Sequence, residues 1–386
     1  TTINARALFA NGNAGPVTLK TYGSLSLTDS FISTQSSAPG NGGTVTITGK
    51  DVTLNNSSIL TFIFGNDDPA LGLLHAGTVT ITAENTVTVS GSLFGDPGIP
   101  VISANATGAF VDAGPVTIAG KTVNLSNGTI DVGMQEGQIS NPENSGAIEI
   151  RGNNVNLSQF TLQSVNAGRT DSSGKGGSIL LRGTDNLRAD NIHLTNSAII
   201  VDSVSGGGAG NIEFETQALT LSDTRVHADT AGIGPGGSIA LHGAQTVTLQ
   251  SNSLISASAL NSDTREGISG PFGSAGNILL DTQQLGMQGR SALRAADLPF
   301  SKGDAGSITV RGTDGHAQSI LIDGTGTGIF TDAGGNGAGG NINLFANAVT
   351  LQNGGTLSAA TSGSALSSTG GTITVDAPNN ITMNNA

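Results

Sequence analysis

A glycine followed by a short stretch that alternates between apolar and polar residues recurs along this chain of 386 residues. Clear copies run from Gly43 to Ile47, from Gly77 to Ile81 and from Gly371 to Val375. A unit that recurs along the whole length predicts a solenoid, in which each copy packs on its neighbours, rather than several globular domains. We name each copy, or coil, by its anchor glycine: Gly15, Gly43, Gly77, Gly114, Gly146, Gly177, Gly210, Gly237, Gly276, Gly306, Gly340 and Gly371.

Two further strand patterns follow the anchored one inside each coil. The second begins five or six residues after the first ends, as in Val52 to Leu54 and Val349 to Leu351. The third follows as closely, as in Ile130 to Val132 and Val226 to Ala228. The mean period is (371 − 15)/11, about 32 residues, which lies in the range of solenoid repeats. We therefore predict an all-β, right-handed parallel β-helix with three sides and about twelve coils.

The corners between the predicted strands have their own residue types. Two residues past the second strand, most coils have Asn, Asp or Gly, which tolerate a left-handed backbone, and only Gln159 and Ser251 depart. Two residues past the first strand, most coils have Gly or Ala, including Gly183, Gly243 and Gly312, which predicts a corner with little room. The asparagines of the first of these two corners are Asn56, Asn127, Asn196 and Asn353.

Surplus length collects mainly before the anchors. It falls in segments 64–76, 94–113, 133–145, 261–275 and 298–305, which predicts loops along one edge of the rod. These loops carry apolar residues and are the expected contact surface, because recognition tends to sit on loops that a rigid scaffold holds. No composition shift marks a domain boundary, so we expect residues 1–386 to be one continuous repeat region, a fragment of a longer chain. The apolar loop residues include Leu71, Leu73, Leu74, Ile268 and Phe272.

Composition argues against several classes of function. A formal net charge of −13 repels a phosphate backbone, so we expect no nucleic-acid partner. The chain has no cysteine, hence no disulfide and no thiolate metal site. No run approaches the roughly 18 apolar residues of a spanning helix, so we expect no membrane-spanning segment. With no Trp and one Tyr, the chain also lacks the aromatic platforms of high-affinity lectins.

The sequence Gly-Gly-x-Ile/Val-x-Ile, then Val-x-Leu, then Asn-x-x-Ile resembles the repeat region of filamentous-haemagglutinin-like exoproteins, which two-partner systems secrete from double-membraned bacteria. The resemblance covers essentially the whole chain. It implies a parallel β-helix, export through an outer-membrane transporter, an extracellular or cell-surface location, and roles in adhesion, aggregation and biofilm formation. The one Asn-Pro pair, at Asn141, lacks the third residue of the Asn-Pro-Asn motif that marks the family's secretion domain. We therefore expect this fragment to lie outside that domain.

Parallel β-helices also include polysaccharide lyases and glycosidases, which place two or three acidic groups on one outward face. The candidates here are Glu149 and Glu213, both at the outward centre of the first strand. They are two coils apart, roughly 9.6 Å at the usual strand spacing, which is wide for an inverting glycosidase. Leu180 lies between them, and we expect no column of Arg, Lys or His beside them. A solvated strand face is the favoured interpretation.

Aspartates recur near the variable corner, where stacked carboxylates could bind Ca²⁺. Their spacing is irregular, which favours Asx turns over a metal site. The five histidines, His75, His193, His227, His242 and His316, share no coil position and are interpreted as solvated residues. The repeated Arg-Gly-Thr-Asp at Arg182 and Arg311 is interpreted as duplication. The aspartates are Asp112, Asp202, Asp229, Asp297 and Asp332.

A column of outward threonines would suit an ice-binding face, but it ends at Glu149. The sequence therefore predicts a secreted or surface-attached adhesive rod, whose partners are receptors or glycans on host or sister cells. It predicts no enzyme activity, no cofactor and no metal. A polysaccharide-cleaving enzyme and an ice-binding rod remain the alternatives. The threonines are Thr18, Thr46, Thr80 and Thr117.

Overall fold

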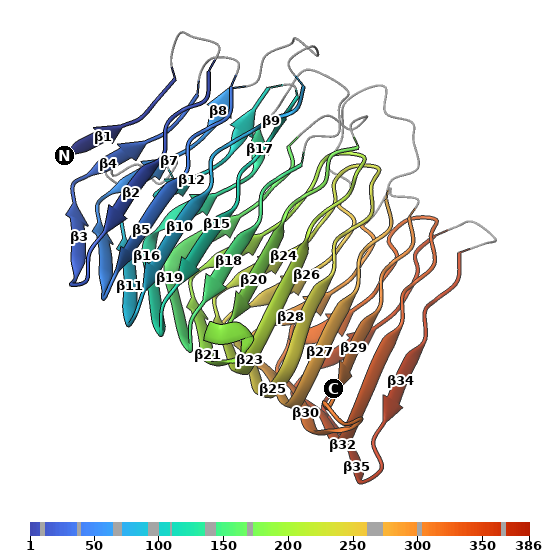
Figure 1. Cartoon of the computed structure of the whole chain (residues 1–386). Coiled ribbons are helices and arrows are strands. Elements are labelled where there is room, and N and C mark those ends of the chain that lie inside the picture. Colours follow the sequence, from blue (N-terminus) through green and yellow to red (C-terminus); the bar gives the residue numbers. More distant parts are fainter. Residues whose placement is uncertain are drawn as a thin grey trace.

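A computed structural model of the chain describes residues 1–7, 12–36, 40–64, 72–91, 100–108, 110–135, 144–167, 173–260, 273–298, 303–363 and 368–386. These residues form a parallel β-helix, and successive coils lie side by side from the N-terminal to the C-terminal end in Figure 1. Three ladders of parallel strands make the three sides. The fold predicted from the repeat is confirmed.

The first side contains the strand that follows each anchor. Its residues stay in register from coil to coil, so that Val45 pairs with Val79 and Ile239 with Ile278. The strands are β2 (Val17–Lys20), β5 (Val45–Gly49), β10 (Val79–Ala83), β15 (Val116–Ala119), β18 (Ile148–Arg151), β20 (Ser178–Arg182), β29 (Ile308–Arg311), β34 (Ile373–Asp376) and the first parts of β23 (Asn211–Ser222), β25 (Ile239–Gln250), β27 (Ile278–Gln288) and β32 (Ile342–Gln352).

The second side follows directly, and in four coils one long strand bends from the first side into it. These long strands and two others join the sides into a single sheet of 30 strands. The second side is made of β3 (Leu25–Thr28), β6 (Val52–Asn55), β11 (Thr86–Ser90), β21 (Ala189–Thr195), β30 (Ala317–Asp323), β35 (Asn380–Asn384), the first parts of β16 (Thr122–Asp131) and β19 (Asn154–Gln163), and the last parts of β23, β25, β27 and β32.

The third side completes each coil. Beyond it, isolated parallel bridges continue the stacking, for example Ser203 with Thr230 and Thr230 with Ala259. The third side is made of β1 (Thr2–Asn4), β4 (Phe31–Ser33), β7 (Ser58–Leu60), β12 (Ile102–Ser103), β22 (Ala198–Ile200), β24 (Arg225–His227), β26 (Leu254–Ser256), β28 (Ala292–Arg294), β31 (Gly328–Phe330), β33 (Thr356–Ser358) and the last parts of β16 and β19.

Some of the surplus sequence before the anchors forms small sheets of its own in the N-terminal half. A satellite apolar cluster packs there, with Ile63, Val111 and Met134 among its members. The strands are β8 (Ile63–Phe64), β13 (Ala106–Thr107) and β17 (Met134–Gln135) in one sheet, and β9 (Leu74–His75) and β14 (Val111–Asp112) in another.

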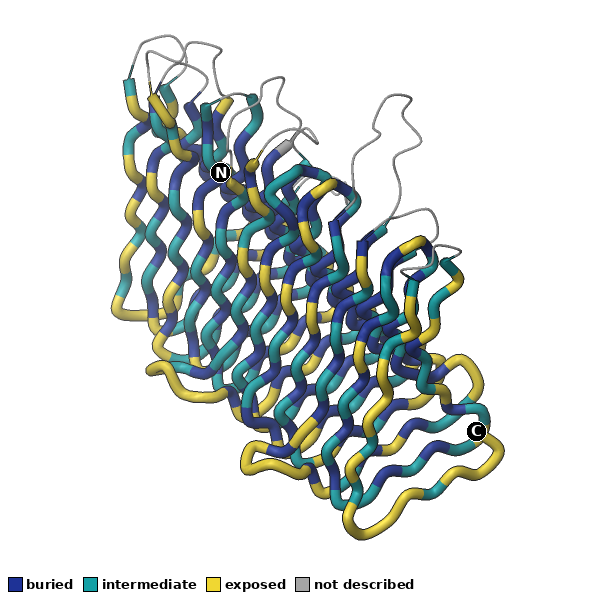
Figure 2. Tube along the Cα trace, turned by 90° about the vertical axis from the view of Figure 1, so that its right-hand side faces the viewer, coloured by how far each residue is buried: buried dark blue, intermediate teal, exposed yellow. Residues whose placement is uncertain are grey.

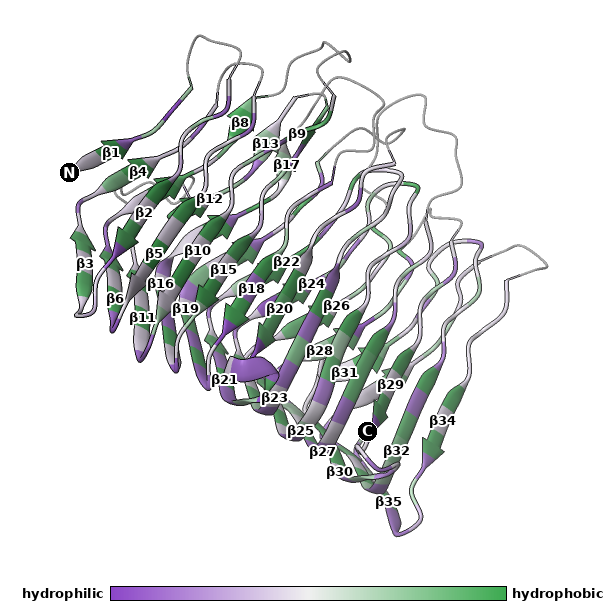
Figure 3. Cartoon of the chain, in the orientation of Figure 1, coloured by the Kyte–Doolittle hydropathy of each residue, from purple (hydrophilic) through white to green (hydrophobic). Residues whose placement is uncertain are grey.

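Alternation inside each strand builds the core. In Figure 2, buried residues alternate with more exposed ones along the inner coils, and Figure 3 shows the apolar residues lying along the strands. The inward residues of neighbouring coils stack into columns, and Val45, Ile47 and Ile81 are completely buried. β-branched side chains suit this pleated, stacked surface. In the last coil the corresponding Ile373 is 43% exposed because nothing in this chain stacks beyond it.

The anchor glycines are required by space. A Cβ at Gly237 would overlap the backbone carbonyl oxygen of Gly210, the anchor of the preceding coil. The same holds at every anchor from Gly43 to Gly371, always against the anchor before it. Backbone therefore packs directly on backbone at this corner, and no other residue type fits.

The predicted left-handed corner is confirmed in all twelve coils. Asn56 has φ of 44° and Asn196 has φ of 46°. Gln159 and Ser251, whose residue types depart from the column, adopt φ of 52° and 56°. Stacking on neighbouring coils therefore imposes this backbone even where the side chain does not favour it.

Two details of the sequence interpretation are wrong. The tight corner after the first strand is occupied by Ala189, Ala244 and Ala317 in the coils where Gly183, Gly243 and Gly312 were assigned. Short insertions there, one containing the 3₁₀ turn η2 (Thr184–Asn186), shift the register. In addition, the 94–113 segment is not wholly a loop before an anchor, because its residues Ile102–Ser103 form β12 of the third side.

In the part of the chain that the structure describes, no helix has the length and apolar character needed to cross a membrane. The loop residues Leu71, Ile268 and Phe272 lie outside the described residues. Leu73 is described and is 47% exposed.

The close packing at the anchors yields a direct test. We expect Gly237→Ala to destabilise the rod by about 1–3 kcal/mol, because the added methyl must push two backbones apart. Gly286→Ala is the matched control, since a Cβ there meets nothing within 4 Å. Replacing a strand glycine with alanine at such an open site should be neutral or slightly stabilising. Circular dichroism melting measures both, and equal melting temperatures would contradict the assigned stacking.

The strained corner at Gln159 yields a second test. Asparagine accepts a left-handed backbone more readily than glutamine, so Gln159→Asn should stabilise the rod by about 0.5 kcal/mol. Gln217→Asn, on an exposed position of β23, is the control and should bring no gain because asparagine is depleted in strands. A melting temperature that falls in the Gln159 variant would show that the corner does not select residue type.

Candidate functional site

The first candidate, Glu149, lies on the outward face of β18 between two arginines. Its Oε2 lies 2.7 Å from Nη2 of Arg151, two residues along the same strand. Its Oε1 lies 2.6 Å from Nη2 of Arg182 in the next coil and also accepts a hydrogen bond from Nε of Arg182. The carboxylate is therefore held by two cations from adjacent coils.

The arginines determine the protonation of this carboxyl group. Partial burial acts to raise the pKa of Glu149, but the hydrogen bonds and charges of Arg151 and Arg182 outweigh it and lower the pKa below its usual value. A general acid needs the opposite shift, towards neutral pH. Glu149 is thus arranged as a permanently charged partner of the arginines.

The second candidate, Glu213, belongs to a separate row. Its Oε1 lies 3.4 Å from Nε2 of His242 in the next coil. The other ring nitrogen of His242, Nδ1, lies 3.5 Å from Oδ2 of Asp281, one coil further on. Oδ1 of Asp281 in turn accepts a hydrogen bond of 2.6 Å from Nε of Arg311. Four consecutive coils thus contribute one residue each to this row, in which carboxylates alternate with a histidine or an arginine.

The expectation that no basic or histidine column accompanies the two glutamates is wrong. Such a column exists at the fifth residue after the anchor, where Arg151 pairs in register with Arg182 and Asp281 with Arg311. It is visible in the sequence once residues are counted from each anchor. Arg182 and Arg311, the first residues of the repeated tetrapeptide, each bind a carboxylate of the preceding coil. The titratable members are Lys20, Arg151, Arg182, Glu215, His242, Asp281, Arg311 and Asp376.

Most of the corner aspartates bind the next coil rather than their own turn, so the Asx-turn interpretation is wrong for them. Oδ1 of Asp112 accepts a hydrogen bond from the backbone N–H of Asn144. Asp202 accepts one from the N–H of Asp229, and Asp229 accepts one from the N–H of Ser258. Asp332 does the same with Ala360. These bonds link successive coils where the backbone ladder is interrupted.

Several of these carboxyl groups are buried, which shifts their protonation. Burial, and then the charge of Asp229, raise the pKa of Asp202 to about 7. Burial also raises the pKa of Asp229 itself, which is 3% exposed. Asp297 is 1% exposed, and burial together with the charge of Asp304 raises its pKa to about 7. The third side thus concentrates unusually protonated carboxyl groups.

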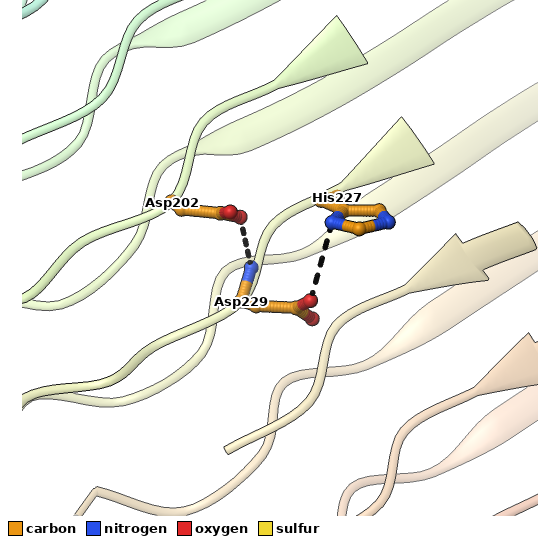
Figure 4. Close-up of side chains that lie close together, drawn as sticks. All are labelled: Asp202, His227 and Asp229. Atoms are coloured by element: carbon orange, nitrogen blue, oxygen red, sulfur yellow. Dashed lines mark hydrogen bonds and ion pairs between the residues drawn. The ribbon is translucent and has the colours of Figure 1, made fainter. Parts of the chain in front are cut away.

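One histidine joins this group. His227 ends β24, and Figure 4 shows its imidazole beside the carboxylates of Asp202 and Asp229. One ligand atom from each of the three residues lies within 4.8 Å of the others. Among the described residues this is the one group of three or more such side chains that could hold a metal ion. Counting back from the next anchor would have found it, since Asp202 and Asp229 both lie eight residues before one.

The other histidines make separate contacts. His75 lies 3.7 Å from Asp112, and His316 lies 3.1 Å from Asp376. His193 is exposed on the second side and contacts Thr195. None of these contacts brings ligand atoms of three such residues as close together as in the group of Asp202, His227 and Asp229, among the described residues.

A shallow groove follows the anchor corner between the Gly146 and Gly237 coils. Glycines and small residues line it, together with Lys175 and Pro235. Lys175 is its one charged lining residue, so the groove lacks the pair of titratable groups that acid–base hydrolysis requires.

The second side has a different surface. Its outward central column pairs in register from Ser26 through Thr53 to Thr382 and contains no Asp, Glu, Lys or Arg. The neighbouring outward column, two residues further along each strand, contains one charged residue, Asp323. The central column is Ser26, Thr53, Thr88, Asn124, Asn156, His193, Thr220, Thr248, Gly286, Leu321, Thr350 and Thr382.

The outward threonines of the first side are aligned as predicted. Thr18 pairs with Thr46, Thr46 with Thr80 and Thr80 with Thr117, and the next partner is Glu149. This column is therefore interrupted by charge, whereas the uncharged column of the second side continues through every coil.

The buried Asp297 generates a prediction about pH. Its folded-state carboxyl keeps its proton up to about pH 7, whereas the unfolded one loses it near pH 4. Rod stability should therefore fall as pH rises from about 4 to about 7, and Asp297→Asn should flatten that decline. Asp304→Asn should flatten it partly, because it removes the neighbouring charge. Melting temperatures measured across this pH range test the prediction. If the melting temperature of Asp297→Asn falls with pH as steeply as that of the parent, Asp297 is not the group responsible.

Comparison of the chain with protein families, with curated proteins and with solved structures found no match. Its functional interpretation therefore depends on the arrangement of its own residues.

Proposed function

We propose that this chain is the structural and adhesive part of a secreted or surface-attached rod that mediates cell adhesion, aggregation or biofilm formation. The observation that carries the proposal is the uncharged second side. A chain with a net charge of −13 presents there two outward columns, built from Ser, Thr, Asn and Gln with few exceptions, that contain one charged residue between them. Such a face can approach another polar, uncharged surface without electrostatic repulsion.

Repetition makes such a face effective. Each hydroxyl or amide can contribute only a weak hydrogen bond in water. Twelve coils held rigidly in register present the same chemistry many times, and simultaneous weak contacts raise the overall strength of attachment. Neutral glycans and a second copy of this rod are partners with matching chemistry. Receptors on host or sister cells that present such glycans would be bound in the same way.

The export route and location belong to the same proposal. The repeat resembles that of filamentous-haemagglutinin-like exoproteins, and that resemblance implies an outer-membrane transporter of a two-partner system as the secretion partner. The absence of cysteine is compatible with passage of an unfolded chain through such a pore. On this view the rod acts outside the cell or on its outer surface.

The alternatives have less support. A glycosidase needs two carboxyl groups with divided roles, but Glu149 is neutralised by two arginines and Glu213 is engaged by His242. An ice-binding face needs a regular threonine array, and that of the first side ends at Glu149. The charged residues of the first side mainly form contacts with residues of adjacent coils.

A bead assay tests the proposed function. Beads coated with the chain should adhere to bacterial or host cells, or to one another, in competition with soluble chain. Placing charge on the second side with Thr88→Lys and Thr220→Lys should reduce adhesion several-fold. The matched control carries Thr80→Lys and Thr117→Lys on the first side, which changes the net charge equally, and should adhere like the parent.

The outcomes separate the possibilities. Parent beads that adhere to nothing would contradict the adhesive function. Adhesion that survives the second-side variant would move the contact to another surface, such as the loops at 67–74 and 261–273, most of which lie outside the described residues. Loss of adhesion in the first-side control alone would assign the contact to the first side.

A further inference from the structure

The cluster of Asp202, His227 and Asp229 lies where two coils meet. Asp202 follows β22 of the Gly177 coil, and His227 and Asp229 lie at and just beyond the end of β24 in the Gly210 coil. Parallel pairing of Ile200 with His227 and the bridge between Ser203 and Thr230 place the two aspartates in neighbouring positions. Residues 227 and 229, two apart in extended backbone, point to the same face.

The three side chains converge on a common space. The Nδ1 atom of His227 lies 3.6 Å from Oδ2 of Asp229, and Asp202 extends from the adjacent coil towards both (Figure 4). Oδ1 of Asp202 accepts the N–H of Asp229, and Oδ1 of Asp229 accepts bonds from Ser256 and Ser258. These bonds fix both carboxylates. Each keeps its second oxygen free of hydrogen bonds from the described residues.

The charges in this space are not balanced. Two carboxylates face each other with Asp229 almost fully buried. Arg225 and Arg294 act on the group electrostatically, but within the described ranges neither Asp202 nor Asp229 has a Lys or Arg nitrogen within ion-pair distance. Nε2 of His227 is buried and accepts or donates no hydrogen bond among the described residues, so this ring nitrogen is open to a ligand. An imidazole beside one buried and one half-buried carboxylate is a donor set that favours a cation.

We propose that Asp202, His227 and Asp229 bind one divalent transition-metal ion of the zinc class, which links the Gly177 coil to the Gly210 coil. An imidazole nitrogen with two carboxylate oxygens suits Zn²⁺ and its neighbours. Calcium prefers six to eight oxygen ligands, and this group offers too few. Three protein ligands leave one position of a tetrahedral ion for water. The ion would hold the two coils together.

The row Glu213, His242 and Asp281 supplies a matched control. It also has a histidine between two carboxylates, but those contact opposite ring nitrogens, Nε2 and Nδ1. One ion cannot bind both carboxylates and the ring there. His242→Ala therefore removes a histidine that also contacts carboxylates of two coils, without touching the proposed site.

Isothermal titration calorimetry of the full, chelator-treated chain with ZnCl₂ tests the proposal. We expect one Zn²⁺ per chain and a melting temperature that rises with Zn²⁺. Asp202→Asn, which can keep its bond to the N–H of Asp229, and His227→Ala should each weaken binding at least about tenfold. His242→Ala should bind like the parent, and CaCl₂ should bind at least about tenfold more weakly than ZnCl₂.

Four results would overturn it. The parent could show no Zn²⁺ binding, or the Asp202 and His227 variants could bind as tightly as the parent while retaining the β signal in circular dichroism. Loss of binding in His242→Ala would place the ion on the first side. Equal affinity for Ca²⁺ and Zn²⁺ would exclude the zinc class. None of these results depends on whether the rod is adhesive.

Discussion

The contact of each anchor glycine with the carbonyl of the anchor before it is the constraint on which the rest of the rod depends. At this corner two backbones approach so closely that a single Cβ would separate them. Because the contact recurs at every coil, it fixes the spacing of the coils and the starting point of each first strand. The inward columns of Val, Ile and Leu can then stack without slipping, since a shift of one residue would expose every one of them.

A fixed register turns single residues into columns, and the chemistry of the surface follows from this. On the first side, carboxylates and cations occupy adjacent coils and bind each other, as at Arg182, Glu149 and Arg151. The second side remains almost free of charge. On the third side, buried aspartates bind backbone N–H groups of the next coil, and one pair meets His227. Each side therefore offers a different surface on the same scaffold.

The features that could be predicted from the sequence are those that only a few residue types accept without strain. Glycine at the anchors and Asn, Asp or Gly at the left-handed corner are such positions, and all were assigned correctly. Alanine at the tight corner was missed in three coils because insertions after the first strand shift the count. Gln159 and Ser251 show that stacking can also impose a left-handed backbone on residue types from which it would not be predicted.

The candidate sites were harder to predict because they depend on which residues become neighbours across coils. Counted forward from their own anchors, Asp202 and Asp229 lie at different distances, since the Gly177 coil contains an insertion. Counted back from the next anchor they coincide. Arg151 and Arg182, the partners of Glu149, are each the fifth residue after an anchor, so their alignment could have been predicted from the sequence. The burial that shifts the carboxyl pKa values, in contrast, has no signature in a single sequence.

The anchors set one constant step per coil, and distances between pairs of spin labels measure that step directly. The chain has no cysteine, so pairs can be introduced without background at Thr46, Thr117, Thr309 and Thr374, which share one outward column. The separations should grow by about 4.8 Å per coil, hence to about 38 Å between Thr46 and Thr309 and about 48 Å between Thr46 and Thr374. Distances that do not increase linearly with the number of coils would contradict this constant step.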